Sequence, residues 1–311
     1  MTALIDIVLP IFAIILTGYL AGRRGLLGQA SSDALNGFVF FIALPVLLFK
    51  AMAQVDPTTV LHWPYIAAYV GGQVITLLVG LAIARFGFGV SPAQAATHGT
   101  VAIYGNVGYM GIPLVLALFG ESALPPAVVA TIINAALNIA MLTAFIEADR
   151  SAGDGRVLRD VAGALGRNPI LIAPFLGLGW ALTGWPLPQP IVTYGAVLGA
   201  AAGPCALFSL GLFLVGKPLS EGRAEVASMT LLKLVLHPAA TAAFGLWLLA
   251  DEPRLFLICV MMAALPTGAN LFILVQRYGV YVARTSTAIL ASTVLSLATL
   301  SALLILSNGM V

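Results

Sequence analysis

The sequence predicts an all-α polytopic membrane protein, and three observations carry this prediction. Hydrophobic residues make up 60% of the 311 residues and charged residues only 8%, whereas soluble domains carry about 25% charged residues. The mean hydropathy is +1.05. Ten mostly apolar segments, separated by polar or Gly/Pro-rich breaks, approach the length of about 20 residues that a membrane-spanning helix needs.

The ten expected spans cover the chain from end to end. The first is followed, rather than preceded, by Arg23 and Arg24, and it lacks a cleavage site of small residues, so we interpret it as a retained helix and not as a signal peptide. The spans are residues 4–22, 35–52, 65–86, 93–119, 125–146, 168–183, 191–215, 226–249, 255–276 and 284–306.

Basic residues are distributed unevenly when the ten spans are threaded back and forth. Of the 14 Lys and Arg residues, eleven fall in loops on one side, Lys50 and Arg254 fall on the other side, and Lys233 lies within a span. Cytoplasmic loops of membrane proteins are enriched in Lys and Arg, so the side with eleven basic residues is expected to be cytoplasmic. We therefore expect a multi-pass protein of the cell inner (plasma) membrane with both termini on the non-cytoplasmic side.

The two halves of the chain carry prolines at matching places. Pro10 and Pro174 lie in the first and sixth spans, and Pro45 and Pro204 lie in the second and seventh. Five spans per half is an odd number, so the second half enters the membrane from the opposite face and the sequence predicts two inverted five-helix repeats. The predicted domains are residues 1–148 and 168–311, with residues 149–167 as a cytoplasmic linker.

Two of the spans are expected to break in their middle. Residues 105–113, Gly-Asn-Val-Gly-Tyr-Met-Gly-Ile-Pro, interrupt the fourth span, and residues 264–270, Ala-Leu-Pro-Thr-Gly-Ala-Asn, interrupt the ninth. Glycine weakens a helix, and proline lacks a donor and clashes with the carbonyl four residues back. Freed backbone groups at membrane depth are tolerated only where they are buried in protein or line a wet cavity. The broken helices 4 and 9 are therefore predicted to cross and to form a binding site at the midplane.

An amide side chain beside unwound backbone suits a carboxylate ligand. Asparagine NH2 groups and freed N–H groups donate hydrogen bonds, and the positive ends of the half-helix dipoles attract anions. Asn106 and Asn270 lie about halfway along the broken spans. For Asn106 we favour substrate contact over a hydrogen bond that only satisfies the broken helix, whereas for Asn270 both interpretations stay open.

Four further polar residues lie within the spans. Asn134 and Asn138 are one turn apart, and we favour hydrogen bonds to neighbouring helices over a place in the cavity wall. Lys233 is expected to extend its ammonium group to the cytoplasmic interface, the alternative being that it attracts anions into a cytoplasmic vestibule. His237 is expected to be a hydrogen-bonded structural histidine, the alternative being proton uptake.

Several classes of function are disfavoured by what the sequence lacks. It contains no His-Glu-x-x-His motif and no pair of carboxylates deep in a span, so we expect no enzyme, no catalytic residue, no metal site and no cofactor. The net charge of +2, without dense basic runs, argues against nucleic acid. The absence of deep acidic residues disfavours sodium coupling, although carbonyl, Asn, Ser and Thr oxygens can also bind sodium, and H+ and Na+ coupling both stay open. A passive channel is a weaker alternative, because paired broken helices suit alternating access.

Several motifs together resemble the auxin efflux carrier family of transporters. The motifs are Leu-Pro-Ile-Phe at 9–12 with Gly-Tyr at 18–19, Ala-Leu-Pro at 43–45, Gly-Asn-x-Gly-x-x-Gly-Ile-Pro at 105–113 and Leu-Pro-x-Gly-x-Asn at 265–270. The resemblance implies a fold of two inverted five-helix repeats, with helices 1, 2, 6 and 7 as a scaffold and helices 3–5 and 8–10 as a transport domain that moves like an elevator. It also implies a homodimer, and substrates such as malonate, malate or auxin-like carboxylates.

The resemblance also assigns roles to particular residues. Asn106 matches the substrate-contacting asparagine of the family, and Pro113 and Pro266 match its crossover prolines. Plant members have Val-Pro where this chain has Asn-Leu at 270–271, and they place an acid and a lysine where it has Tyr69 and Gln73.

The sequence therefore predicts a secondary transporter, either a permease or an efflux carrier, for small organic anions within the lipid bilayer. The runner-up is a sodium-coupled carrier that resembles the bile-acid symporters. The predicted substrate-binding residues are Gly105, Asn106, Gly108, Pro113, Pro266, Gly268 and Asn270. The predicted supporting or coupling residues are Tyr69, Gln73, Asn134, Asn138, Lys233 and His237.

Overall fold

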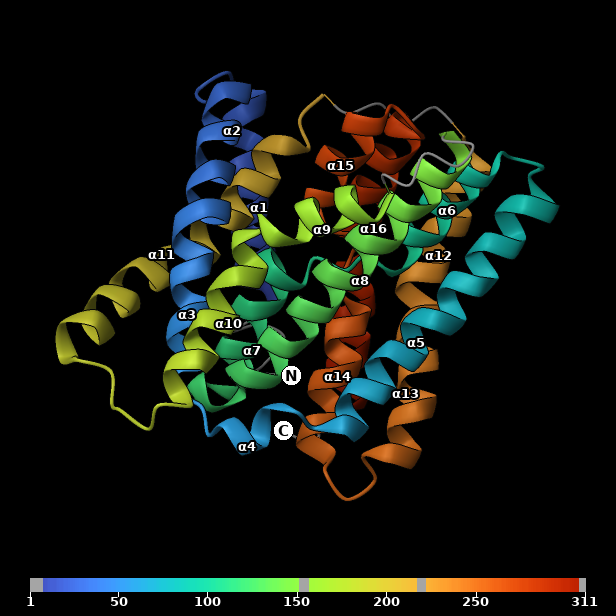
Figure 1. Cartoon of the computed structure of the whole chain (residues 1–311). Coiled ribbons are helices and arrows are strands. Elements are labelled where there is room, and N and C mark those ends of the chain that lie inside the picture. Colours follow the sequence, from blue (N-terminus) through green and yellow to red (C-terminus); the bar gives the residue numbers. More distant parts are fainter. Residues whose placement is uncertain (1–7, 151–156, 217–221, 308–311) are drawn as a thin grey trace.

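The structure is a computed structural model that describes residues 8–150, 157–216 and 222–307 (Figure 1). Within these ranges every regular element is a helix, which confirms the predicted all-α class. Six helices, some of them built from consecutive elements, are long and apolar enough to cross a membrane. They are Gln29–Ala53, Pro57–Gly87, Glu121–Ile146, Gln189–Phe213, Arg223–Leu248 and Val282–Leu306.

The other predicted segments also form helices, which are shorter or interrupted. The segment predicted to break at 105–113 forms α6 (Pro92–Ile103), η4 (Val107–Gly111) and α7 (Ile112–Phe119), and the ninth forms α14 (Pro253–Ala264) and α15 (Asn270–Tyr278). The remaining elements are α1 (Leu9–Arg23), α2 (Gln29–Phe38), η2 (Val39–Ala43), α3 (Leu44–Ala53), α4 (Pro57–Val60), α5 (Trp63–Ala82), η3 (Ile83–Gly87), η5 (Glu121–Ala123), α8 (Leu124–Arg150), α9 (Val157–Gly166), α10 (Pro169–Ala181), α11 (Gln189–Phe213), α12 (Arg223–Leu231), η6 (Leu232–Leu236), α13 (His237–Leu248) and α16 (Val282–Leu306).

Three of the helices contain a π-helical turn that ends two residues before a proline. The turn η2 precedes Pro45, η4 precedes Pro113 and η6 precedes Pro238, each with one residue between. Proline removes one N–H from the helical ladder and its ring clashes with the carbonyl four residues back. The ladder widens by one residue at each of these places, so the helix continues past the proline instead of ending there.

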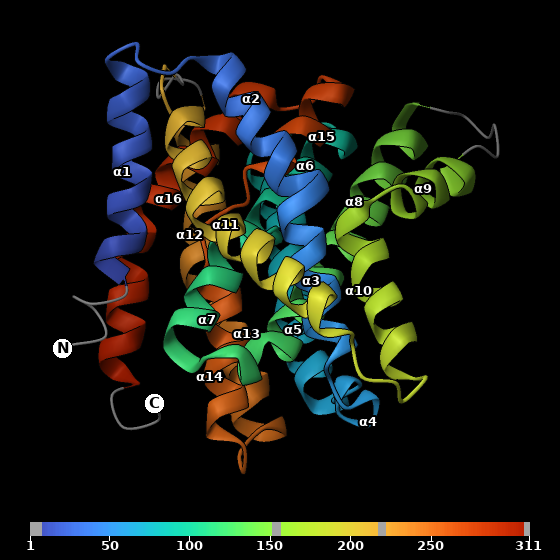
Figure 2. The same ribbon diagram turned by 90° about the vertical axis from the view of Figure 1, so that its left-hand side faces the viewer.

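The long helices pack into two groups. In one group α1 lies against α11, α3 against α10, and both α2 and α3 against α11. In the other group α5 lies against α6, α13 and α14, while α8 packs on α6 and α12 packs on α16. The two views of the ribbon show the helices roughly side by side, with α2 at one end of the bundle and α4 at the other (Figures 1 and 2).

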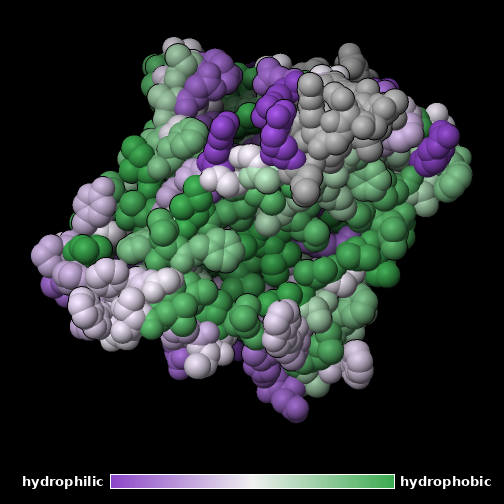
Figure 3. All heavy atoms as spheres, viewed as in Figure 1, coloured by the Kyte–Doolittle hydropathy of each residue, from purple (hydrophilic) through white to green (hydrophobic). Residues whose placement is uncertain are grey.

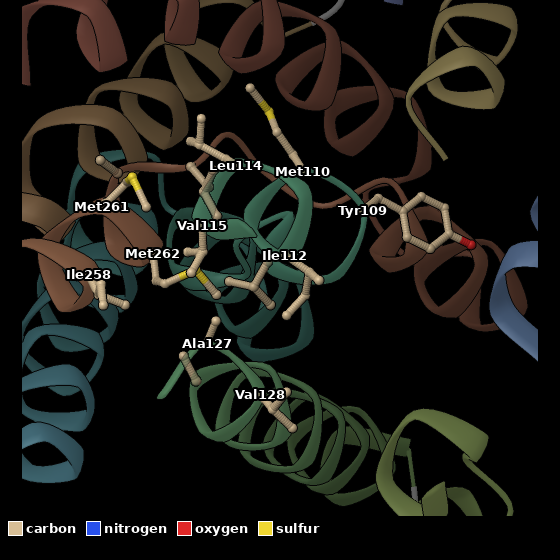
Figure 4. Close-up of a cluster of buried hydrophobic side chains, with 14 of the residues drawn as sticks. Tyr109, Met110, Ile112, Leu114, Val115, Ala127, Val128, Ile258, Met261 and Met262 are labelled. Atoms are coloured by element: carbon tan, nitrogen blue, oxygen red, sulfur yellow. The ribbon is translucent and has the colours of Figure 1, made fainter. Parts of the chain in front are cut away.

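On the face seen in Figure 3, apolar side chains form a belt across the middle of the molecule, and hydrophilic residues gather toward its upper and lower ends. Inside, α7 packs against α8 and α14 through residues such as Ile112, Val128 and Met262 (Figure 4). An apolar belt between polar ends is the distribution expected of a bundle that stands across a bilayer.

Glycines let the helices of the first group approach to backbone contact. A Cβ atom built on Gly18 lies 2.1 Å from the Phe208 carbonyl oxygen, and one on Gly211 lies 2.0 Å from the Ile15 carbonyl oxygen. On α10, a Cβ on Gly177 lies 2.4 Å from the Phe49 carbonyl oxygen. Small residues at such contacts are a general means of holding membrane helices together, because lipid supplies no hydrophobic force between them.

The contact between α3 and α10 yields a testable prediction. We expect Gly177→Ala to lower the stability by about 1–3 kcal/mol, because the added methyl overlaps the α3 backbone. The matched control is Gly179→Ala on the same helix, where a Cβ meets nothing within 4 Å and where alanine favours the helix. Thermal unfolding in detergent measures both, and equal melting temperatures for the two variants would contradict the proposed close contact.

Candidate functional site

The two interrupted helices are joined to each other at their interruptions. The backbone is extended at Tyr104, which follows α6, and at Leu265, which follows α14. The Asn106 N–H donates to the Pro266 carbonyl at 2.8 Å, and the Gly268 N–H donates to the Tyr104 carbonyl at 2.9 Å. These bonds make an antiparallel bridge between Gly105 and Thr267. Backbone groups that leave the helical ladder thus find partners in the other interrupted helix.

Side chains from the next helix in each half complete this pairing. Asn134 of α8 accepts from the Gly105 N–H at 3.0 Å and donates from Nδ2 to the Gly105 carbonyl at 3.1 Å. Ser292 of α16 accepts from the Thr267 N–H at 3.1 Å. The Thr267 hydroxyl donates to the Val101 carbonyl at 3.1 Å, close to the end of α6.

Thr267 and Ser292 did not figure among the predicted site residues. Thr267 could have been found, because it lies inside the predicted break at 264–270 and a hydroxyl there can replace a missing backbone donor. Ser292 carries no such signal, since it is one of several Ser and Thr residues in the last span.

The side chain of Asn106 differs from that of Asn134 in its hydrogen bonding. Its side chain is only 4% exposed, and its Nδ2 atom has no hydrogen-bond partner among the described residues. Its carbonyl accepts from the N–H groups of Met110 and Gly111 at 3.0 and 3.1 Å, so Asn106 begins the helix η4–α7. The N–H groups of the first residues of a helix have no partner within it, and such an N-terminus attracts anions.

Five of the predicted substrate-binding residues line one small cavity beside the paired segments. Its volume is about 20 Å³, which is room for about one water molecule. Asn134 also lines it, whereas Pro113 and Pro266 do not. The five residues are Gly105, Asn106, Gly108, Gly268 and Asn270.

Two of these glycines keep the walls of the cavity close together. A Cβ on Gly268 lies 2.8 Å from the Tyr104 ring and 3.0 Å from the Gly105 carbonyl oxygen. A Cβ on Gly108 lies 3.1 Å from Leu44 of α3. A larger residue at Gly268 would have to push the two interrupted helices apart, and one at Gly108 would have to shift the end of the Leu44 side chain.

The two predicted crossover prolines lie outside the cavity and differ in their surroundings. Pro266 is part of the paired segment and its carbonyl accepts from Asn106. Pro113 lies past the π-turn η4, at the start of α7, where a Cβ on Gly203 of α11 is 2.9 Å from its ring. Pro113 is thus linked to the packing between α7 and α11.

The expectation that Lys233 extends to the cytoplasmic interface is wrong. Its side chain is fully buried, and Nζ donates to the Ala263 carbonyl at 2.6 Å and lies 2.9 Å from Nδ1 of His237. Ala263 is in the last turn of α14, whose carbonyls have no partner within the helix, and this free acceptor holds the amine in the interior. His237, also fully buried, is hydrogen-bonded through Lys233.

The remaining predicted supporting residues lie around the same region. Tyr69 and Gln73 are fully buried on α5, one turn apart, and the Tyr69 ring lies 6.1 Å from the His237 ring between centroids. Asn138 donates to the Asn134 carbonyl at 2.7 Å, one turn earlier on α8. The structure therefore places Tyr69 beside His237, the partner of Lys233, and Asn138 beside Asn134, the partner of Gly105.

A larger cavity of about 880 Å³ lies at the end of the bundle where α4 is found. Its wall contains Lys50 and Arg254, the two basic residues predicted for the non-cytoplasmic loops. Lys50 pairs with Glu121 at 3.3 Å, while Arg254 donates to the Phe119 carbonyl at 2.6 Å. The sequence did not predict this vestibule, because its walls come from α3, α4, α5, η5, α8, α14 and the connections between them, which are far apart along the chain.

The hydrogen bonds of Asn134 yield a second prediction. We expect Asn134→Ala to cost several kcal/mol, since it leaves two buried backbone groups of Gly105 unpaired and each costs about 1–3 kcal/mol. Asn138→Ala is the control on the same helix, because its Nδ2 donates to the Asn134 carbonyl, which belongs to the α8 ladder, and at 3.4 Å to the Asn134 Oδ1, so that Gly105 keeps both of its partners. Thermal unfolding should show a much larger loss for Asn134→Ala, and similar losses would exclude the special role of Asn134.

Comparison with known proteins finds similar proteins over almost the entire chain. Residues 3–304 match the family model described as membrane transport protein. A Rhizobium meliloti protein named "Putative malonate transporter" is 32% identical, with 98% of this chain and 96% of that protein aligned. Auxin efflux carrier component 5 of Arabidopsis thaliana is 24% identical, over 96% of this chain and 95% of the plant protein.

A third relative, the uncharacterized transporter YfdV of Escherichia coli (strain K12), is 27% identical over 95% of this chain and 94% of its own length. These relatives are named as transporters or carriers and not as enzymes. The family model spans far more than half of the chain, and the malonate-named relative covers nearly all of it. The chain therefore belongs to the membrane transport protein family, the family of the auxin efflux carriers, and is a multi-pass membrane transporter.

Proposed function

We propose that this protein is a secondary transporter for small carboxylates, which bind where the two interrupted helices meet. One observation carries the proposal: the Asn106 amide is buried beside paired, non-helical backbone and its Nδ2 donor has no protein partner among the described residues. A buried donor without a partner costs about 1–3 kcal/mol. A carboxylate oxygen would satisfy it, together with the N–H groups at the start of η4.

The proposed architecture has ten membrane-spanning helices in two inverted repeats, with the fourth and ninth crossing at the cavity. Its support is the equivalence of the two interruptions. Gly105 bonds to Asn134 of the following helix, and Thr267 bonds in the same way to Ser292. The two non-helical segments also pair with each other antiparallel, as expected for an inverted repeat. In this arrangement both termini lie on the non-cytoplasmic side.

Transport is proposed to proceed by an elevator motion of one group of helices against the other. The cavity of about 20 Å³ is too small for a dicarboxylate, so the site must open for a substrate to enter. The group of α1, α2–α3, α10 and α11 is the proposed scaffold, and backbone contact at its glycines suits a rigid body. The proposed transport domain contains α5–α8 and α12–α16, and we propose that two scaffolds pack together in a homodimer.

Malonate is the first substrate to test, because one relative carries that name. Malate and the auxin indole-3-acetate extend the test to a longer dicarboxylate and to an aromatic monocarboxylate, the latter because plant relatives are named auxin efflux carriers. Proteoliposomes with separately imposed sodium and pH gradients distinguish proton coupling, the sodium-coupled alternative and passive flow.

The third prediction concerns Asn106. We expect Asn106→Ala to abolish carboxylate uptake and to change the melting temperature by no more than about 2 °C, because Nδ2 makes no hydrogen bond to any residue that the structure describes. Uptake into proteoliposomes and thermal unfolding are measured on the same preparations. Asn138→Ala is the matched control, since it removes a buried amide that does not line the cavity.

Each outcome for Asn106→Ala has a distinct meaning. Lost uptake with unchanged stability supports substrate contact. Undiminished uptake would show that Asn106 is a structural amide and that the substrate binds elsewhere. If the wild-type protein transports none of the three carboxylates, the proposed substrate class is wrong.

A further inference from the structure

Lys233 is a fully buried lysine whose two hydrogen-bond partners carry no negative charge. Nζ lies 2.6 Å from the Ala263 carbonyl oxygen and 2.9 Å from Nδ1 of His237. An ammonium group has three N–H donors, so one donor is left after these two contacts. The residue sits in the π-turn η6, and π-turns occur frequently at functional sites.

The amine lies directly behind the candidate site. Nζ is 3.6 Å from the position that a Cβ atom on Gly105 would occupy, and the Met262 carbonyl oxygen is 3.4 Å from the same point. Gly105 lines the small cavity, whereas Lys233 does not. A single backbone strand therefore separates the Lys233 amine from the place where we propose that an anion binds.

Among the described residues, no carboxylate is left unpaired on the helices that pack against Lys233. Among the described residues, the acidic side chain on the helices packed against η6 is Glu225, which pairs with Arg284 at 3.3 Å. A buried charge without a counter-charge is costly, in the membrane as in a protein core. The titratable or charged groups on the packed helices are Tyr65, Tyr69, His98, Tyr104, Arg223, Glu225, His237, Arg254, Cys259 and Arg284.

We propose that Lys233 is the counter-charge of the transported anion and binds a proton together with it. This inference rests on the proposed carboxylate transport. Without the anion the amine is neutral, and when a carboxylate binds at Asn106 the amine takes one proton from water and becomes an ammonium. The carboxylate and the proton then cross as a pair, and the ammonium balances the charge of the one carboxylate group that is bound at Asn106. Lys233 acts through the backbone, and thus as a positioning residue that does not touch the substrate.

Malonate binding to purified protein at pH values from about 6.5 to 9.5 tests this inference. In the wild type we expect affinity to fall as the pH rises, by up to about tenfold per unit, because binding requires one proton. Lys233→Met keeps the length of the side chain but removes the charge, and it should weaken binding about 30-fold at the lowest pH and abolish the pH dependence.

Lys233→Arg provides the second, independent variant. Its guanidinium stays protonated over this range, so binding should persist but no longer depend on pH. This pattern separates a charge effect from a structural one, because loss of a mere hydrogen bond to Ala263 would not flatten the pH profile. Lys50→Met, in the vestibule at the end of the bundle, is the control and should behave like the wild type.

The outcomes also separate this inference from the proposed function. Binding by Lys233→Met with wild-type affinity and pH dependence would overturn the role of Lys233 while leaving carboxylate binding intact. A wild-type pH profile in Lys233→Arg would overturn the proton uptake, even if Lys233→Met does not fold. Absence of malonate binding by the wild type and by Lys50→Met would overturn malonate as the substrate and the counter-charge with it.

Discussion

The backbone pairing between residues 104–106 and 266–268 is the constraint on which the rest of the candidate site depends. Two helices stop inside an apolar bundle, and their freed N–H and C=O groups must find partners there because water is scarce. Some of these groups on each helix bond to the other helix: the Asn106 N–H donates to the Pro266 carbonyl, and the Gly268 N–H donates to the Tyr104 carbonyl. Neither interruption would be stable without its counterpart.

This constraint explains several residue choices around the cavity. Gly268 is required because Tyr104 and the Gly105 carbonyl leave no space for a side chain. Asn134 is required because the N–H and C=O groups of Gly105 take no part in the bonds of the bridge and need an acceptor and a donor of their own. The Asn106 amide is the exception, since its Nδ2 is buried beside the same backbone and has no hydrogen-bond partner in the part of the chain that the structure describes. That asymmetry between two neighbouring asparagines is what favours a ligand at Asn106.

The same constraint determines where Lys233 can lie. The end of α14 leaves the Ala263 carbonyl without a helical donor, and Lys233 provides one at 2.6 Å. In the other half, the Thr267 hydroxyl gives the Val101 carbonyl its donor. The free carbonyls at the ends of α14 and α6 thus receive hydrogen bonds from different groups, an amine and a hydroxyl. Only the amine can carry a charge, and this gives the proposed transporter a means of linking the anion and the proton.

The sequence alone determined the helical class, the approximate ends of the apolar segments and the two interruptions, because these follow from local hydropathy and from the backbone chemistry of Gly and Pro. It also identified Asn106 and Asn134, but it could not separate their roles, since both are amides inside apolar spans. Only the tertiary structure decided that Asn134 holds Gly105, that Thr267 and Ser292 take part, and that Lys233 turns inward. The partners of these groups lie on other helices, from 25 to 166 residues away along the chain, and local sequence contains no record of which helices meet.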